Sequence, residues 1–165
     1  MALAAALMLT AAACGSDDGG STGGSGGSTG STGASGGSTG ASGGSTIDVT
    51  VQEYAILPAQ ASATTGDVTF DVANTGPKET HEFVVIRTDI AATDLPTKAD
   101  GSVDEEANGL EGIDEIEDIA VGDTPSLTVS LQPGSYVFIC NIVNTKGGKT
   151  ISHYQQGMTA AFTVT

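Results

Sequence analysis

Alternation of apolar and polar residues, the period of a β-strand, runs through the second part of the chain. It is clearest at Val68, Phe70 and Val72, which are separated by polar residues and followed by the turn sequence Asn-Thr-Gly-Pro. No long stretch has apolar residues at helical spacing. Further segments with the alternation are 47–51, 54–56, 127–131, 136–140 and 160–164. The pattern therefore predicts an all-β domain.

The run HEFVVI at 81–86 is apolar on both faces after its first two residues. Such a run is typical of a strand in the middle of a sandwich, where both faces of the sheet are covered. About seven short strands with turn signals between them favour a Greek-key β-sandwich.

The segment 89–123 differs from the rest of the domain. It holds 12 of the domain's 18 acidic residues, and its only apolar points with regular spacing are Ile113, Ile116 and Ile119. We expect a loop that contains a short helix or an edge strand. Its acidic residues lack the spacing of an EF-hand, so a solvated face is a better interpretation than a calcium site.

The beginning of the chain has the features of an export signal. Residues 1–13 form an apolar run that is too short to span a membrane and has the length of a signal-peptide core. The three alanines directly before Cys14 resemble a bacterial lipobox. We therefore expect residues 1–14 to be a lipoprotein-type signal peptide that ends at a lipidated Cys14. A plain secretory signal with an incidental cysteine is the alternative, and either one predicts export.

Residues 15–46 contain only Gly, Ser, Thr, Ala and the pair Asp17-Asp18. This composition predicts a disordered linker with a root-mean-square reach of about 30 Å. A glycosylated or merely tolerated spacer is the alternative. Residues 47–165 are then the folded domain, which is long enough for one hydrophobic core.

The charge of the chain is strongly negative, at −15 for 20 acidic and 5 basic residues. Such a surface argues against binding nucleic acid or anionic lipid, so we expect contact with the membrane only through the lipid anchor. The charge fits a basic partner surface, and an acidic proteome would produce the same bias.

The inventory of metal-binding side chains is the central observation. Outside the first 14 residues the chain has one Cys, two His and one Met, which are Cys140, His81, His153 and Met158. A thiolate, two imidazoles and a weak thioether are the ligands of a blue-copper electron-transfer site. Each residue alone is more often structural, so their positions decide the interpretation.

Those positions resemble the cupredoxin family, in its plastocyanin- and azurin-like blue copper proteins. LQPGSYVFIC is similar to the family's strand that ends at the copper cysteine, and HYQQGM has its His-x4-Met spacing. NTGPKETHEFVVI places His81 after a turn, where the family has its first histidine. The resemblance implies one copper ion held by His81, Cys140, His153 and Met158, with His153 near the surface as the electron port.

Two departures from the family pattern are visible. Twelve residues separate Cys140 from His153, where most small cupredoxins have only a few, and Glu82 stands where many members have Asn. A loop insertion with fixed ends costs little free energy, so we expect the site to persist, with an exposed tip at Lys146-Gly147-Gly148-Lys149.

The expected function is one-electron transfer outside the cytoplasm, by a monomer anchored in the periplasm or at the cell surface, to a redox partner protein. An enzyme is not expected, because multicopper oxidases and nitrite reductases need more histidines than two. The alternatives are a copper delivery or storage module and a metal-uptake accessory domain, neither of which cycles between oxidation states.

Overall fold

The computed structural model of the protein describes residues 44–165. The predicted signal peptide, Cys14 and all but the last three residues of the predicted linker lie outside these residues. Between residues 44 and 165 the secondary structure is β throughout, and this part of the chain has no helix long and apolar enough to cross a membrane. The strands are β1 (Ser45–Gln52), β2 (Ala55–Pro58), β3 (Ser62–Ala63), β4 (Gly66–Asn74), β5 (His81–Arg87), β6 (Glu111–Ile119), β7 (Ser126–Leu131), β8 (Gly134–Ile139), β9 (Val143–Lys146), β10 (Lys149–Ser152) and β11 (Thr159–Val164).

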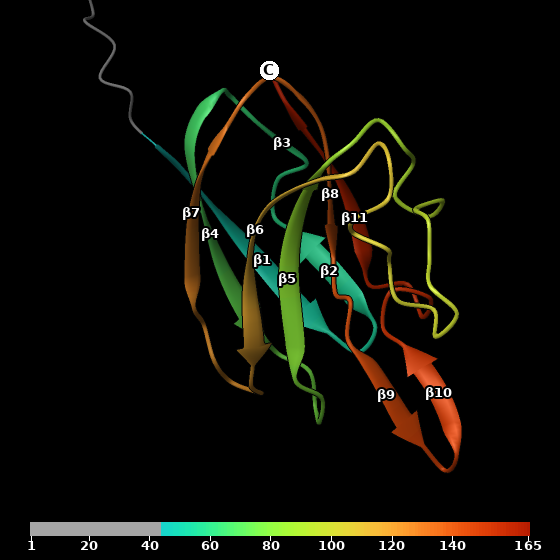
Figure 1. Ribbon diagram of the computed structural model, residues 1–165. Helices are drawn as coiled ribbons and strands as arrows, with labels where there is room; N and C mark the ends of the chain where they lie inside the picture. Colours follow the sequence, from blue (N-terminus) through green and yellow to red (C-terminus); the bar gives the residue numbers. More distant parts are fainter. Residues whose placement is uncertain (1–43) are drawn as a thin grey trace, which may run out of the picture. The chain divides into compact units, whose positions relative to one another are not determined.

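The strands form a two-layered sandwich with a projecting hairpin (Figure 1). One sheet has the order β2-β1-β4-β7 and the other has the order β3-β11-β8-β5-β6, while β9 and β10 pair only with each other. The chain passes from the first sheet to the second between β4 and β5 and returns between β6 and β7. The predicted Greek-key β-sandwich is confirmed.

The core between the sheets is built on four phenylalanines. Phe70 of the first sheet lies 5.5 Å from Phe83, 5.1 Å from Phe138 and 5.7 Å from Phe162 of the second sheet, measured between ring centroids. All four are almost completely buried. Tilted and edge-to-face contacts at such distances are favourable beyond the burial of apolar area. This cluster packs β4 of the first sheet against β5, β8 and β11 of the second.

The strand β5 has both faces covered, as its apolar run predicts. Val84 and Ile86 point away from the central core and pack in a second cluster with Leu95 and Tyr154. The long connection 88–110 therefore covers the outer face of the second sheet and lies beside the segment that carries His153.

The acidic segment contains an edge strand, β6, and no helix within residues 89–123. Its pairing with β5 shifts register twice, and these shifts let Ile116 lie opposite Phe83 and Ile119 opposite His81. Of the two elements expected here, a short helix or an edge strand, the structure has the edge strand, and irregular pairing accommodates the spacing of three between the isoleucines. The charged residues between them hinder pairing with another chain at this edge.

The long segment between Cys140 and His153 folds into the hairpin β9-β10, which the sequence did not predict. Its two-residue turn is Gly147-Gly148, with φ values of 57° and 77°. Positive φ at both positions is the requirement of a type I′ hairpin turn, which glycine meets without strain. The predicted exposed tip is confirmed at this turn.

Candidate metal centre

Three of the predicted ligands meet at one end of the sandwich. His81 is the first residue of β5, Cys140 directly follows β8, and His153 directly follows β10. All three side chains are fully buried, and one donor atom of each lies within 4.8 Å of the others. Adjacent antiparallel pairing of β5 with β8 brings the beginning of one strand beside the end of the other, which explains how residues 59 apart become neighbours.

The donor atoms that converge are Cys140 Sγ and the Nδ1 atoms of both histidines. His81 Nδ1 lies 3.3 Å from His153 Nδ1, and Cys140 Sγ lies 3.3 Å from His153 Nδ1 and 3.9 Å from His81 Nδ1. Ligands that are each about 2.0–2.3 Å from one metal ion must lie within about 4.6 Å of one another. The three atoms meet this condition, and their chemistry, two imidazole nitrogens and one sulfur, fits a single copper ion.

Met158 is fully buried and belongs to the same core cluster as Cys140. Its backbone is tied to two of the candidate ligands, because its N–H donates to the carbonyl of His153 at 3.0 Å and its carbonyl accepts from the N–H of Cys140 at 3.1 Å. Gly157 makes the tight turn before it possible, with φ at 110°. The structure thus holds Met158 beside the cluster, and its role as a weak axial ligand stays a prediction.

Burial sets the protonation of the metal-free cluster. It raises the pKa of the Cys140 thiol to about 12, and burial together with the nearby His81 lowers the pKa of His153 to about 4. The pKa of His81 is lowered by burial as well. At neutral pH the imidazoles are therefore neutral and able to bind a metal, while the thiol must release its proton when it does so.

The strand after His81 supports the cysteine sulfur. The backbone N–H of Glu82 donates to Cys140 Sγ at 3.4 Å, and the carboxylate of Glu82 accepts from the N–H of Asn141. The side chain of Asn141 in turn bonds both the N–H and the carbonyl of Val103. Glu82 therefore links the two ligand-bearing strands from the position where many cupredoxins have Asn.

The loop before His81 is held by two residues that the sequence analysis did not single out. Glu53 Oε1 accepts from the backbone N–H groups of Lys78 at 2.9 Å and Glu79 at 2.6 Å. Asn74 Nδ2 donates to the carbonyls of Glu79 and Ile119. The turn sequence that begins at Asn74 could have identified Asn74 as important from the sequence, whereas no neighbouring sequence motif distinguishes Glu53.

The expectation that His153 lies near the surface is wrong. Its side chain is fully buried, because the hairpin β9-β10 folds beside it and Tyr54 packs against its ring edge to face, 5.2 Å between centroids. A ligand loop of only a few residues could not form this hairpin, so the length of the segment between Cys140 and His153 contributes to the burial.

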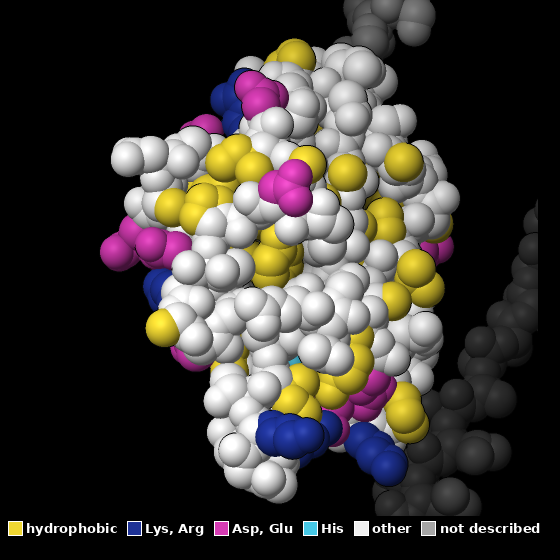
Figure 2. Space-filling model, turned by 90° about the vertical axis from the view of Figure 1, so that its right-hand side faces the viewer, with side chains coloured by type: hydrophobic (Ala, Val, Ile, Leu, Met, Phe, Trp, Pro, Cys, Tyr) yellow, Lys and Arg dark blue, Asp and Glu magenta, His cyan; other side chains and the backbone are white. Residues whose placement is uncertain are grey.

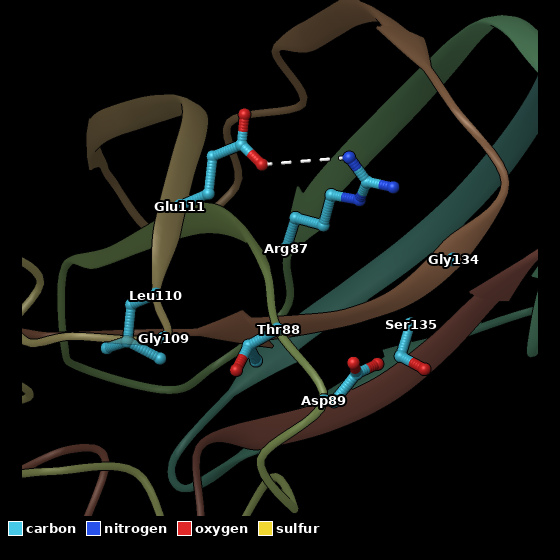
Figure 3. A pocket seen from close by; sticks show the side chains of 8 residues that line it. All are labelled: Arg87, Thr88, Asp89, Gly109, Leu110, Glu111, Gly134 and Ser135. Carbon is cyan, nitrogen blue, oxygen red and sulfur yellow. Dashed lines mark ion pairs between the residues drawn. The ribbon is translucent and has the colours of Figure 1, made fainter.

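A surface depression at the far end of β5 is separate from the cluster (Figure 3). It is lined by Arg87, the last residue of the strand that begins with His81. Arg87 forms an ion pair with Glu111 at 3.7 Å and donates to the carbonyl of Pro133 at 3.0 Å. Since its cation is already paired, the depression offers no unpaired charge to an anionic ligand.

Comparison with known proteins finds similarity only among solved structures, since neither a family model nor a curated protein matches the sequence. An auracyanin from Roseiflexus castenholzii has 20% identity, covering 73% of this chain and 97% of its own, at a TM-score of 0.49. Auracyanin A from Chloroflexus aurantiacus, a "blue" copper protein, has 18% identity. The match covers 74% of this chain and 100% of auracyanin A, at a TM-score of 0.49. Rusticyanin from Thiobacillus ferrooxidans has 20% identity. The match covers 74% of this chain and 79% of rusticyanin, at a TM-score of 0.41.

The resemblance to cupredoxins is confirmed. It rests on this chain's own two-layered Greek-key sandwich and on the buried cluster of His81, Cys140 and His153 at the positions of the family's motifs. Both features were implied by the sequence motifs around these residues.

Proposed function

We propose that the protein is a type 1 copper protein that transfers single electrons. The observation that carries the proposal is the convergence of Cys140 Sγ and the two Nδ1 atoms in a fully buried cluster with Met158 beside it. Copper supplies the change between Cu(I) and Cu(II), and sulfur together with imidazole suits both states. Four protein side chains would surround the ion, which favours electron transfer over catalysis on a substrate.

The protein's own contribution would be to hold the donors in place and exclude water. Cys140 is fixed from both sides, by the N–H of Glu82 on its sulfur and by its own N–H on the carbonyl of Met158. The fully buried histidines come from two different chain segments that are each hydrogen-bonded to the sandwich. A rigid donor set that need not rearrange is the property that fast single-electron exchange requires.

The test is to add Cu(II) to the purified protein and record its visible absorption spectrum and voltammogram. We expect one equivalent to produce an intense thiolate-to-copper band and a reversible one-electron wave. Copper binding without the band and the wave would contradict the proposal and favour delivery or storage.

Replacement of Met158 by Leu tests the axial ligand. Leucine keeps the volume of the buried side chain but offers no sulfur, so we expect the absorption band to remain and the reduction potential to change. Voltammetry of the variant beside the wild type measures the change. Complete loss of copper from Met158→Leu would mean that this residue is more than a weak ligand.

We further propose that the protein is exported and anchored to the cell membrane through Cys14, which lies outside the described residues. Support comes from the lipobox-like alanines before Cys14 and from the acidic composition of the domain, which gives it no affinity of its own for anionic lipid. Its partner would be a redox protein outside the cytoplasm, met by a monomer of this chain.

Replacement of Cys14 by Ala should move the protein from the membrane to the soluble extracytoplasmic fraction, because no lipid can then be attached. Cell fractionation followed by immunoblotting measures the distribution. A Cys14→Ala protein that still sediments with membranes would contradict lipidation at this residue.

A further inference from the structure

The hairpin β9-β10 makes contact with the candidate metal centre through one side chain. Asn144, in β9, places its Nδ2 atom 2.9 Å from His153 Nε2. The inner nitrogen of the same ring, Nδ1, faces Cys140 Sγ and His81 Nδ1. Both nitrogens of His153 are thus engaged, one by the cluster and the other by the hairpin.

Asn144 is itself held in place by a charged pair. Its Nδ2 atom lies 3.1 Å from Glu79 Oε2, and Glu79 Oε1 forms an ion pair with Lys146 Nζ. Glu79 lies two residues before His81, so this network joins the loop of the first histidine to the hairpin beside the second. Because the carboxylate of Glu79 is mostly shielded from solvent, at 16% side-chain exposure, its contacts are less screened than those of a surface pair.

The two histidines are supported differently. His81 Nε2 is buried and has no hydrogen-bond partner within residues 44–165, so packing alone fixes this edge of the ring. His153 is the residue whose outer nitrogen has a polar partner. Asymmetric support of this kind points to a specific role for the hairpin at His153 rather than a general covering of the site.

We propose that Asn144 is a positioning residue for His153 and is itself held by Glu79 and Lys146. The hairpin between Cys140 and His153 supplies Asn144 to the site. The inference rests on the proposed copper function. A metal on Nδ1 leaves the hydrogen of a neutral imidazole on Nε2, and the metal-free ring can carry it on either nitrogen. In the structure Asn144 Nδ2 donates to Nε2, so the ring carries its hydrogen on Nδ1. With a metal on Nδ1, the amide would have to turn its Oδ1 toward the Nε2–H, in exchange for the contact of Nδ2 with Glu79.

The positioning has a consequence for the redox partner. Basic side chains gather at the lower end of the face in Figure 2, where Figure 1 places the hairpin. Since Asn144 occupies the outer edge of His153, a partner that approaches this end meets the hairpin and not the imidazole. Electrons that leave through the Nε2 edge of His153 therefore pass Asn144.

The test compares Asn144→Leu with Lys149→Ala. Leucine has a similar size but no polar group, whereas Lys149 is an exposed residue of the same hairpin. Loss of a residue that orients a metal-binding histidine typically weakens metal binding by about 10- to 100-fold. We expect this loss of Cu(I) affinity in Asn144→Leu, measured by competition with a chelator, and wild-type affinity in Lys149→Ala.

A second measurement uses the metal-free protein and does not depend on copper. In ¹⁵N NMR spectra, the ring-nitrogen signals of His153 should move in Asn144→Leu, and the signal of His81 Nε2, which has no polar contact with the hairpin, should move less. Glu79→Gln, which removes the charge pair but keeps an acceptor for Asn144, should shift the same His153 signals by a smaller amount. Unchanged His153 signals in both variants would overturn the proposal, as would wild-type Cu(I) affinity in Asn144→Leu. Absence of the absorption band from the wild-type protein would instead overturn the proposed function.

Discussion

Replacement of Cys140 by Ser is expected to abolish the intense visible absorption of the copper-loaded protein and to leave the sandwich folded. The band requires a thiolate bound to Cu(II), and a serine hydroxyl at the same place cannot supply one. Serine is close in size to cysteine, and its hydroxyl can accept from the N–H of Glu82, which now donates to the sulfur. The buried hydroxyl should therefore cost no more than about 1–3 kcal/mol of stability.

The chain offers a matched control for this substitution, since its other cysteine is Cys14. Cys14→Ser should keep the full band, and far-ultraviolet circular dichroism should show the same β structure in both variants. Absorption at the wild-type intensity in Cys140→Ser would exclude Cys140 as the thiolate ligand.

Replacement of Glu82 by Gln is expected to change how the stability of the metal-free protein depends on pH. The pKa of Glu82 is raised from 4.5 to about 7, mainly by burial and also by the carboxylates of Glu115, Glu105 and Glu117, while the N–H of Asn141 acts to lower it. Such a difference between the folded and unfolded protein corresponds to about 3 kcal/mol. Glutamine keeps the acceptor for Asn141 but cannot ionise.

The direction of the effect follows from where the proton is held more tightly. The folded protein binds the Glu82 proton better than the unfolded chain, so this contribution to stability is complete below pH 4.5 and is lost as the pH rises through about 7. The pKa values of His81 and His153 are lowered, so these residues make the stability rise with pH. The quantity to measure is therefore the difference in stability between the variant and the wild type, in which the histidine contributions cancel.

Urea unfolding of the metal-free proteins between pH 5 and pH 8 would measure this difference. We expect Glu82→Gln to gain about 2.5 kcal/mol relative to the wild type between about pH 5 and pH 8. Glu106→Gln, a substitution at an exposed position in the same acidic segment, is the control and should follow the wild-type curve. Parallel curves for Glu82→Gln and the wild type would contradict the assignment of a buried, raised carboxyl to Glu82.

The β-sandwich was predictable because its information is local. Alternation at Val68, Phe70 and Val72 reports a strand with one buried face, and each of these side chains is fully buried in the structure. The edge strand β6 was harder, since two register shifts replace the strand period with the spacing of Ile113, Ile116 and Ile119. Local pattern and tertiary pairing disagree there, and the helix that the spacing also allowed does not form.

The sequence by itself determined the chemistry of the site. Turn residues and apolar runs mark the strand boundaries at His81 and Cys140, and the spacing to Met158 marks His153. These short-range signals need no knowledge of the fold. Only the tertiary structure decided how the site is enclosed. Glu82 reaches Asn141 across 59 positions, Glu53 reaches the loop before His81, and Asn144 meets both His153 and Glu79. Such contacts depend on which segments the packed sheets bring together, and a polar side chain carries no local mark of the partner that it will find.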